Sequence, residues 1–345
     1  MMRVLVAMSG GVDSSVAAAL VRDAGHHTVG ATMKLWGGPS DTGCCSVSDV
    51  EDARRVAQQL GINHQVFNFS EDFDRHVVEP YVADHAAGRT PNPCIECNRR
   101  LKFDRFLDRA RRLGFDAVAT GHHARVERGP DGAWELCRGA DPAKDQSYVL
   151  HMLGQPELAQ LLLPVGSMTK AEVRARARAL GLRTAAKPDS QDVCFIPRHG
   201  GRQAFLASRV TLHPGRVVDE GGRPVGEVAA VELVTVGQRK GLGSSIGSRY
   251  VTQVDTASAT VHVGPLADLM VDRILLVRPA WVGRAPAPGE RFEVQLSAHG
   301  QPVPGRWDGE GRVALDEPVR RVAPGQSVVL YRGESVVGGG VALAA

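Results

Sequence analysis

The heptapeptide SGGVDSS at residues 9–15 constrains the fold more than any other feature, because it directly follows an apolar run at residues 4–8. Such a run, closed by two glycines and followed by an alanine-rich stretch, predicts a strand, a tight loop and a helix. The glycines allow positive φ and a close approach to a bulky anion, toward which the helix directs its N–H groups. Serine hydroxyls add donors, and Asp13 is suited to hold a Mg²⁺ ion between phosphate oxygens. The segment predicts a phosphate-binding loop; the alternative is an ordinary turn with a serine helix cap.

The loop is not of the Walker type, since no Gly-Lys-Ser/Thr follows the glycines. Its order, SGGxDS after the first strand, resembles the PP-loop of ATPases that cleave ATP to AMP and pyrophosphate. That resemblance implies ATP and Mg²⁺ as ligands. It also implies a chemistry in which a carbonyl or carboxyl oxygen is adenylated and so becomes a leaving group.

The bulk properties indicate a globular protein of more than one domain. A length of 345 residues exceeds one ordinary core, and 43% hydrophobic with 23% charged residues is typical of soluble proteins. No apolar stretch approaches the ~18 residues of a membrane span, and the immediate entry into a strand leaves no room for a signal peptide. We therefore expect a cytoplasmic protein without a membrane partner. In that reducing compartment its six cysteines are expected to be reactive or metal-binding.

The first half of the chain alternates predicted strands and helices. Strands are predicted at 3–8, 28–35, 62–69 and 117–120, and helices at 14–24, 48–60 and 99–113. Ser48 and Glu51 form a predicted capping box for the second helix, after a loop that contains Cys44 and Cys45. The alternation predicts an α/β fold with a mainly parallel sheet and helices on both faces. Ligands bind such sheets at the carboxyl ends of the strands, where the loop, Met33 and Gly121 fall.

The later part of the chain changes in character. A hairpin is predicted from residues 124–127 and 134–138, and helices at 148–153, 156–163 and 170–180. After about residue 205, short Val-rich runs broken by Gly and Pro predict one or two small antiparallel β modules.

Positive charge is concentrated in two stretches, although the net charge is only +3. Residues 98–112 contain seven basic side chains against two aspartates, and residues 170–187 contain six against one glutamate. Such helices could neutralise a phosphate backbone, which would indicate RNA binding. Solvated basic helix faces are the equally acceptable alternative.

The cysteines suggest reactive thiols. Cys94 and Cys97 form a Cys-x-x-Cys unit directly before the first basic helix, where a helix N-terminus and neighbouring arginines lower the pKa of a thiol. A zinc site is the alternative, but the sequence lacks a second Cys/His pair of suitable spacing. Cys194 lies between Val193 and Phe195, so a buried apolar position is its alternative.

Taken together, these motifs closely resemble the tRNA-specific 2-thiouridylases, which replace the C2 oxygen of the wobble uridine with sulfur. The matching segments, in the order of the family, are SGGVDSS at 9–15, the strand around Met33, TPNPxxxCN at 90–98, TGHHA at 120–124, KDQSY at 144–148, DVCFI at 192–196 and TVGQRKG at 235–241. They span about two thirds of the chain, and the joint match is far more specific than any single motif.

The resemblance implies a fold and a domain organisation. It predicts a PP-loop domain of the adenine nucleotide α-hydrolase type at 1–203, a small central β-rich domain at 204–270, and a C-terminal antiparallel β-barrel that contacts tRNA at 271–345. We expect the protein to be a monomer.

The resemblance also implies the roles of individual residues. Cys194 would carry a persulfide received from a desulfurase or relay protein, and Cys97 would act as nucleophile, leaving a transient Cys97–Cys194 disulfide. ATP would be bound by Ala7, Met8, Ser9, Gly10, Gly11, Val12, Asp13, Ser14, Met33 and Gly121. The tRNA, of the Lys, Glu or Gln type, would be contacted by Asn92, Pro93, Cys94, His122, Lys144, Asp145, Gln146 and Gln326, with Gln238 and Arg239 as further contacts. Plain strand core is the alternative for Met33, and ordinary surface or loop positions are the alternatives for His122 and the 144–146 segment.

Two departures from the family pattern leave alternatives open. Many relatives have Asp where this chain has Cys94, which creates a set of three thiols, Cys94, Cys97 and Cys194. Three thiolates could hold an iron–sulfur cluster with one open iron, which is a second route for sulfur transfer. Residues 294–299 also lack the basic-aromatic pair that some relatives use for tRNA.

Two other functions remain alternatives at this level. The first is another PP-loop ligase that forms AMP, such as an argininosuccinate or nucleotide synthetase, which would need no paired cysteines. The second is a cysteine-based metal or redox module that binds RNA, which would not release pyrophosphate from ATP.

Overall fold

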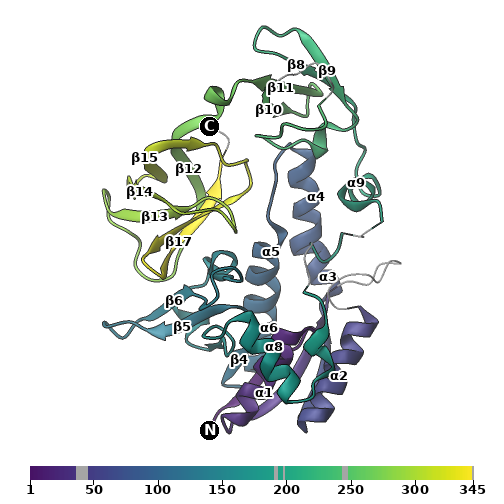
Figure 1. Cartoon of the computed structure of the whole chain (residues 1–345), viewed down its shortest axis with the longest axis vertical. Helices are drawn as coiled ribbons and strands as arrows, with labels where there is room; N and C mark the ends of the chain where they lie inside the picture. Colours follow the sequence, from purple (N-terminus) through teal and green to yellow (C-terminus); the bar gives the residue numbers. More distant parts are fainter. Residues whose placement is uncertain (36–45, 190–192, 197–198, 243–247, 344–345) are drawn as a thin grey trace.

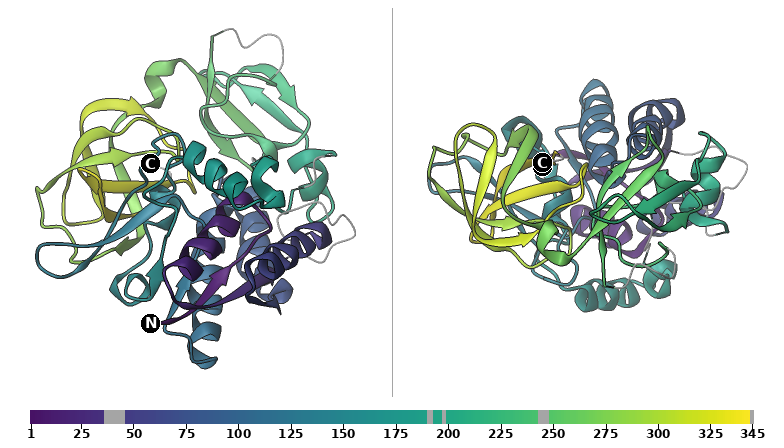
Figure 2. Two further views of the ribbon diagram at one scale, coloured as in Figure 1. Left: turned by 60° about the horizontal axis from the view of Figure 1, so that its bottom comes forward. Right: turned by 90° about the horizontal axis from the view of Figure 1, so that it is seen from above.

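The computed structural model describes residues 1–35, 46–189, 193–196, 199–242 and 248–343. Cys44 and Cys45 lie outside these ranges. Figure 1 shows an α/β domain at the bottom, a small β module at the upper right and a barrel at the upper left, and Figure 2 shows the same three bodies from two other sides.

The α/β domain is built on a parallel sheet, as predicted. Its strands have the order β3-β2-β1-β4-β7, and all neighbours are parallel. The bounds are β1 (Arg3–Ala7), β2 (His27–Lys34), β3 (Asn63–Asn68), β4 (Ala117–Ala119) and β7 (Leu161–Leu162). Strand β1 is an uninterrupted apolar run because helices cover both of its faces.

The side chains of β1 divide between two cores, one on each face of the sheet. Val4 and Val6 pack with helices α1 (Val12–Asp23), α2 (Val47–Leu60) and α8 (Lys170–Ala179). Leu5 and Ala7 belong to a larger apolar cluster on the other face, which includes Phe106 and also both Cys97 and, at its border, Cys194.

A single long helix on that second face begins earlier than predicted. It runs through α5 (Pro93–Glu96), η2 (Cys97–Arg105) and α6 (Phe106–Arg112), and its middle section η2 is π-helical. Asn92 is the N-cap, and its side chain accepts a hydrogen bond of 3.1 Å from the Cys94 N–H. The Asn-Pro pair is a typical helix start, since Pro fits the first helical position. Cys94 therefore lies in the first turn and Cys97 about one turn later, rather than ahead of the helix.

Three local predictions were wrong. Residues 156–163 were predicted as helix, but the short helix α7 (Gln155–Leu158) is followed by strand β7, whose Leu161 pairs with Val118. A short apolar run buried at a sheet edge cannot be distinguished from a helix by periodicity. The capping box of α2 uses Ser46 and Asp49, not Ser48 and Glu51. Only one 3₁₀ turn, η3 (Ser147–Leu150), forms within 148–153.

The remaining helical elements are short. They are α3 (Ser70–Phe73), the π-helical η1 (Asp74–Val78), α4 (Glu79–Ala86), η4 (Arg183–Ala186), α9 (Gly201–Ala207), η5 (Val231–Leu233) and η6 (Leu266–Leu269). No helix in the described ranges is long and apolar enough to cross a membrane.

The central β module is a mixed sheet rather than an antiparallel one. Its strands β8 (Gly215–Val218), β9 (Pro224–Val228), β10 (Tyr250–Asp255) and β11 (Thr260–Gly264) have the order β10-β11-β8-β9. The β11–β8 pair is parallel, whereas both outer pairs are antiparallel.

The C-terminal module is a closed antiparallel barrel. It consists of β12 (Met270–Trp281), β13 (Arg291–Gln295), β14 (Val303–Trp307), β15 (Arg312–Arg320), β16 (Ser327–Arg332) and β17 (Ser335–Ala342). Pairing of β12 with both β15 and β17 closes it. The predicted hairpin, β5 (Ala124–Arg128) and β6 (Trp134–Arg138), extends from the α/β domain and pairs with β17.

The barrel also holds the segment that precedes Cys94. The Thr90 N–H donates to the Pro324 carbonyl at 2.7 Å, and the Gln326 amide donates to the Thr90 carbonyl. Gly325 has φ +94°, and a Cβ there would lie 3.2 Å from the Thr90 carbonyl carbon. The start of the long helix is therefore fixed from two domains.

Buried histidine is a further link between domains. His85 of α4 donates from Nδ1 to the Glu232 carbonyl of η5 at 3.3 Å, and its ring packs edge-on against Tyr81. Burial lowers the pKa of His85 from 6.5 to about 4, because the charged form would lose its hydration.

We predict that this histidine makes stability fall as the pH decreases from about 6.5 toward 4. In that window the unfolded chain binds a proton at His85 and the folded chain does not, so stability changes by up to about 1.4 kcal/mol per pH unit. Thermal unfolding of wild type and His85→Gln at pH 7 and pH 5 measures this: the variant should lose less stability on acidification. The same pH response in both proteins would contradict the prediction; His27→Gln, at an exposed histidine, is the control.

Candidate active site

The predicted phosphate-binding loop connects the carboxyl end of β1 to helix α1. The N-cap of α1 is Gly11, which has no side chain that could accept hydrogen bonds from the first N–H groups of the helix. The Ser9 N–H donates to Ser14 Oγ at 3.2 Å, and Ser15 Oγ donates to the Gly11 carbonyl at 2.8 Å. The loop is therefore closed by its own serines around the helix start, which is the arrangement that suits an anion.

Two glycines allow this loop to pack as it does. Gly10 has φ +73°, and a Cβ there would lie 2.3 Å from the Asp49 carbonyl oxygen at the start of α2. A Cβ on Gly121, which follows β4, would lie 2.6 Å from the Ser14 nitrogen and 2.7 Å from the Asp13 carbonyl carbon. The first turn of α1 thus lies directly against Gly121, and the loop before it lies directly against α2 at Gly10, so a larger residue at either glycine would displace the loop region.

Other residues predicted to bind ATP lie in the core around this loop. Ala7, Met8 and Val12 are buried, and Met33 of β2 is 8% exposed within the larger apolar cluster. Burial in a strand also agrees with the plain core alternative for Met33, so its adenine contact stays a prediction.

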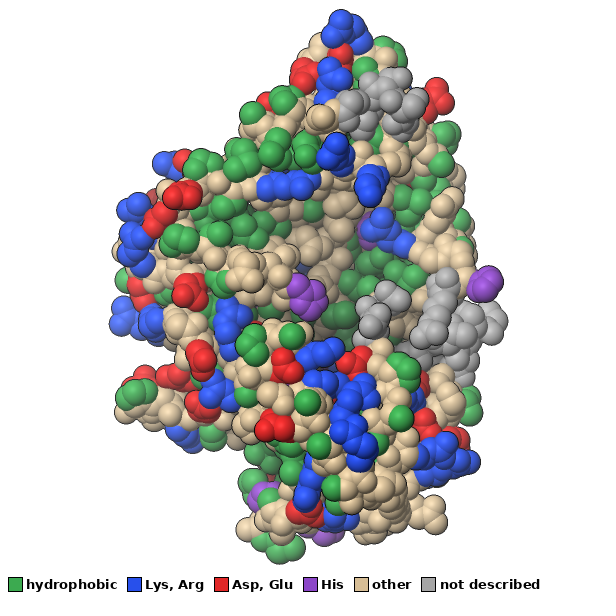
Figure 3. All heavy atoms as spheres, viewed as in Figure 1, with side chains coloured by type: hydrophobic (Ala, Val, Ile, Leu, Met, Phe, Trp, Pro, Cys, Tyr) green, Lys and Arg blue, Asp and Glu red, His purple; other side chains and the backbone are tan. Residues whose placement is uncertain are grey.

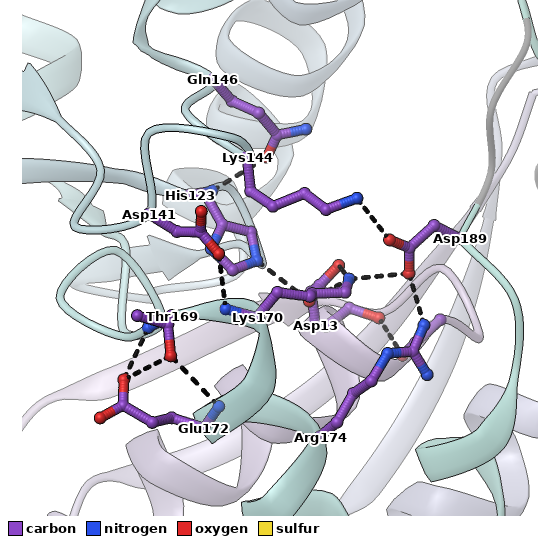
Figure 4. Close-up of polar contacts among 12 residues, drawn as sticks. Asp13, His123, Asp141, Lys144, Gln146, Thr169, Lys170, Glu172, Arg174 and Asp189 are labelled. Carbon is purple, nitrogen blue, oxygen red and sulfur yellow. Dashed lines mark hydrogen bonds and ion pairs between the residues drawn. The ribbon is translucent and has the colours of Figure 1, made fainter.

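Asp13, the acidic residue of the loop, is paired within the protein. Lys170 Nζ lies 2.8 and 2.7 Å from its two carboxylate oxygens, and His123 Nε2 lies 3.1 Å from one of them (Figure 4). Burial opposes ionisation of Asp13, but hydrogen bonds from His123 and Lys170 outweigh it and lower the pKa of the carboxyl. Asp13 is therefore ionised and oriented at the mouth of the loop.

A second carboxylate, Asp189, gathers three cations. Lys144 and Lys170 each approach it to 2.9 Å and Arg174 to 2.7 Å, as Figure 4 shows. Burial acts to raise the pKa of Asp189, but the two lysines outweigh it and lower the pKa to about 2. Lys170 therefore bridges Asp13 and Asp189.

Lys187 ties the same segment to the phosphate loop. Its Nζ donates to the Gly10 carbonyl at 3.0 Å and pairs with Asp49 and Asp52 of α2 at 2.6 and 2.8 Å. The segment 187–189 is thus attached to the loop region at both of its ends.

The two basic stretches are largely paired within the protein. In 170–187, Arg176 pairs with Asp23 and Arg183 with Asp52, in addition to the residues above. In 98–112, Arg105 pairs with Asp72 and Arg112 with Asp108. Charge density in the sequence therefore overstates the basic surface that is available to RNA. Figure 3 nevertheless shows Lys and Arg on both sides of a hollow between the α/β domain and the two β modules.

The two predicted reactive cysteines border one apolar cluster. Cys97 is 9% exposed and opens the π-helical section, a kind of helix irregularity that is frequent at functional sites. Cys194 is half-buried, and the next residue, Phe195, is held by edge-on contacts with Phe73 and Tyr81 at ring distances of 5.6 and 5.3 Å. Cys94 is exposed.

The described residues do not form a metal centre. No three Cys, His, Asp or Glu side chains among them gather closely enough to hold a metal ion. Cys94, Cys97 and Cys194 thus do not fit an iron–sulfur cluster in this arrangement, and we derive no step through one.

Several residues predicted to contact tRNA have protein partners. His122 is buried; Lys102 donates to its Nε2 at 3.2 Å, so Nδ1–H donates to Thr120 Oγ1 at 2.7 Å. Burial, with a further effect of Lys102, holds the pKa of His122 well below 6.5, so the ring is neutral.

The residues of the 144–146 segment differ in how they are held within the protein. Asp145 accepts hydrogen bonds from Arg138, Ser147 and the Gly139 N–H. Gln146 accepts from the His123 N–H at 2.9 Å. The side chain of Lys144 is 42% exposed and pairs with Asp189, and its backbone N–H donates to the Asp141 carbonyl. Asn92 caps the long helix, Pro93 is its buried first residue and Gln326 binds Thr90, so these residues also have structural functions.

Sequence reasoning missed the ion-pair network. Lys170 and Lys187 were seen only as part of a charged stretch, and no role was predicted for Asp189 or His123. One signal was present: Thr169 and Glu172 form a capping box that makes Lys170 the first residue of α8.

Comparison with known proteins decides the family. A family model described as tRNA methyl transferase HUP domain matches residues 2–198, one described as tRNA methyl transferase PRC-barrel domain matches 203–265, and one described as aminomethyltransferase beta-barrel domain matches 271–342. A protein of Chloroflexus aurantiacus named tRNA-specific 2-thiouridylase MnmA is 49% identical, covering 99% of this chain and 98% of its own. The chain belongs to this 2-thiouridylase family.

A second 2-thiouridylase agrees with that assignment. A tRNA-specific 2-thiouridylase of Thermobifida fusca is 47% identical, covering 98% of this chain and 94% of its own. Among solved structures, the U34-tRNA thiolase NcsA of Methanococcus maripaludis matches 60% of this chain and 63% of its own, with 16% identity and a TM-score of 0.37. The predicted fold, a PP-loop domain followed by a β-rich module and a C-terminal barrel, is confirmed.

We predict that Gly121→Ala weakens the phosphate loop. The new Cβ would collide with backbone of the first turn of α1, costing about 1–3 kcal/mol of stability. Displacement of that turn should lower the affinity for ATP by about tenfold or more. Calorimetric titration with Mg·ATP measures this, with Gly283→Ala as control because a Cβ there meets nothing within 4 Å. Unchanged ATP affinity in Gly121→Ala would contradict the assignment of the loop.

Proposed function

We propose that this protein is an ATP-dependent tRNA sulfurtransferase that converts the wobble uridine of tRNA to 2-thiouridine. The observation that carries the proposal is that Cys97 and Cys194, nearly 100 positions apart in the sequence, border one apolar cluster on the sheet that carries the phosphate loop. The names of its closely similar relatives support the substrate and the product.

The first step is adenylation. The uridine O2 attacks the α-phosphorus of ATP, pyrophosphate leaves, and C2 then carries AMP as its leaving group. The first turn of α1 would bind the phosphates through its N–H groups, with Ser9 and Ser14 hydroxyls beside them. Asp13 is the carboxylate that would hold Mg²⁺ together with phosphate oxygens, and the ion would neutralise charge on the departing pyrophosphate.

The second step transfers sulfur. A desulfurase or a relay protein first loads Cys194 with a sulfane sulfur, giving a persulfide. Its terminal sulfur attacks C2 and AMP leaves. The Cys97 thiolate then attacks Cys194 Sγ, so that the bond between Sγ and the transferred sulfur breaks and a Cys97–Cys194 disulfide forms. A two-electron thiol reductant of the cytoplasm reopens the disulfide, which balances the cycle.

The tRNA would lie in the hollow between the domains. Lys144 is suited to a phosphate contact because it is a partly exposed cation, and Asn92, Pro93 and Cys94 surround the start of the helix that bears Cys97. We assign the domains to 1–203, 204–270 and 271–345, with the barrel as a second tRNA-contacting body.

We predict that Cys97→Ser and Cys194→Ser each abolish thiolation without abolishing adenylation. Removing either sulfur should lower 2-thiouridine formation by at least about 1,000-fold. Cys194→Ser cannot form the persulfide, and Cys97→Ser cannot form the disulfide that releases the transferred sulfur. Mass spectrometry of nucleosides from unmodified tRNA, incubated with protein, ATP, Mg²⁺ and a sulfur donor, measures the product. Tracking of ATP–pyrophosphate exchange in parallel measures adenylation.

Cys137→Ser is the matched control, because Cys137 lies in β6 and contacts Ser335, away from the loop. It should form 2-thiouridine as the wild type does. Thiolation by Cys97→Ser at the wild-type rate would refute the role of Cys97 as the nucleophile, and no product from the wild type would refute the proposed function.

A further inference from the structure

Arg278 has an unusual backbone conformation for its residue type. It lies within strand β12 with φ +50°, in the left-handed region that residues with a Cβ rarely adopt. Among the described residues, the other non-glycine with positive φ is Ala259, which lies in the turn between β10 and β11, where this conformation is common. Because Arg278 lies in a strand, no such turn explains its strain, and strain of this kind is frequent at functional sites.

The conformation of Arg278 belongs to a β-bulge. The pairing of β12 with β17 shifts register after Val277, so that Arg278 and Pro279 together oppose one residue, Gly340. A Cβ on Gly340 would lie 3.1 Å from the Val277 carbonyl oxygen, so the partner strand follows the bulge closely. Bulges with a left-handed first residue usually have glycine there. In this barrel an arginine occupies the position that glycine would occupy without strain.

The side chain of Arg278 extends from the barrel to the helix that bears Cys97. Its Nη1 lies 4.0 Å from Glu96 Oε1, and Arg99 Nε lies 3.7 Å from the same oxygen. Glu96 directly precedes Cys97, at the end of α5 (Figure 1). Arg99 and Arg100 follow Glu96 at positions i+3 and i+4, so they project from the same side of the helix. Three arginines from two domains are therefore grouped at one carboxylate.

This group has positive charge that the protein does not neutralise. Within the described ranges, Arg278 and Arg99 pair with no carboxylate other than Glu96, and Arg100 has no ion pair. Both distances to Glu96 are longer than a hydrogen bond, and the buried Arg99 Nε has no acceptor among the described residues. Burial lowers the pKa of Arg99, and Arg278 and Arg100 lower it further, although Glu96 acts to raise it. An additional anion would offset this repulsion.

We propose that Arg278, together with Arg99 and Arg100, binds one backbone phosphate of the tRNA beside the wobble uridine. The proposal rests on the proposed function, because it takes tRNA as the substrate. The guanidinium group suits this contact, since its planar set of N–H donors can bind two phosphate oxygens at once. A phosphate bound by the barrel and by the helix, within one turn of Cys97, would hold the tRNA at the nucleophile.

The strained backbone of Arg278 is explained by this function. In a regular strand the side chains alternate between two faces, so the direction of each is set by its position. The extra residue of a bulge breaks that alternation and redirects a side chain, as bulges beside active sites do. Glycine would follow the same backbone path without strain but would supply no charge. Arginine at this position therefore indicates that the side chain is required, and not the bend alone.

The test is filter binding of unmodified tRNA that has a wobble uridine, with wild type and Arg278→Ala, at salt concentrations from about 50 to 200 mM. Loss of one charged phosphate contact should lower the affinity about tenfold. It should also reduce the slope of log affinity against log salt by about one. A merely structural function of Arg278 would lower the affinity equally at every salt concentration, and an unchanged slope would overturn the proposal. Calorimetric titration with Mg·ATP should give wild-type affinity, because the phosphate loop is not altered.

Two further variants separate the charge from the strain. Arg278→Gly should lose as much tRNA affinity as Arg278→Ala but melt at a higher temperature, since it lacks the Cβ that φ +50° disfavours. Arg278→Lys keeps the charge without the paired donors, so it should recover the salt slope but only part of the affinity. Wild-type tRNA affinity in Arg278→Gly, or no recovery of the slope in Arg278→Lys, would contradict a phosphate contact.

Arg312→Ala is the matched control. Arg312 is an arginine of the same barrel and is 49% exposed, compared with 67% for Arg278. It lies 3.9 Å from Asp308 and 3.6 Å from Glu310, so its charge is already offset by two carboxylates. Its loss should leave the tRNA affinity and the salt slope of the wild type. Equal losses in Arg312→Ala and Arg278→Ala would overturn the proposal, because they would show a general effect of net charge.

Failure of this contact and failure of the proposed function have different signatures. If wild type forms 2-thiouridine and Arg278→Ala binds tRNA as wild type does, the phosphate contact alone is refuted. If wild type binds tRNA but forms no 2-thiouridine, the proposed function is refuted, and the salt slopes of the variants still decide whether Arg278 contacts RNA. A wild type that does not bind tRNA refutes both.

Discussion

The close backbone contact of the first turn of α1 with Gly121 is the constraint on which the rest of the site depends. It leaves no room for a side chain between the end of β4 and the start of the helix, so the position of the phosphate loop is set by the sheet itself. On the other side, Gly10 lies against the start of α2. A loop whose backbone is fixed on both sides is preorganised to receive an anion, which is the condition for strong electrostatic stabilisation of negative charge.

The ion pairs around this loop position charged side chains more than they stabilise the fold. Lys170 is 12% exposed and divides its charge between Asp13 and Asp189, and a partly buried cation with two acceptors gains little from either pair alone. A polyanionic ligand offers more negative charge than both. The network therefore fixes the position of Lys170 beside the phosphate loop.

The fold was predictable from the sequence further than the site was. The apolar run before SGGVDSS and the alternation after it predict the parallel sheet, because burial on both faces leaves a direct trace in composition. Strand β7 was missed because Leu161 and Leu162 form too short a run to show a period. The bridge from Asp13 through Lys170 to Asp189 joins residues over 170 positions apart, and pairing across such separations is fixed by packing, not by any local pattern. Lys102 and His122 also meet only through packing, and burial, with a further effect of Lys102, keeps the His122 ring neutral.

The two sulfur-bearing residues differ in a way that matches the work proposed for them. Cys97 is buried within a continuous helix whose start is capped by Asn92 and tied to the barrel through Thr90, so it can react only with a group brought to it. Cys194 is half-buried, and the ring of Phe195 directly after it is anchored against other aromatic rings. A carrier must reach both a sulfur donor outside the site and a substrate within it, whereas a resolving nucleophile can stay in one position. A half-buried Cys194 and a Cys97 that is fixed within a helix therefore agree with the proposed order of carrier and nucleophile.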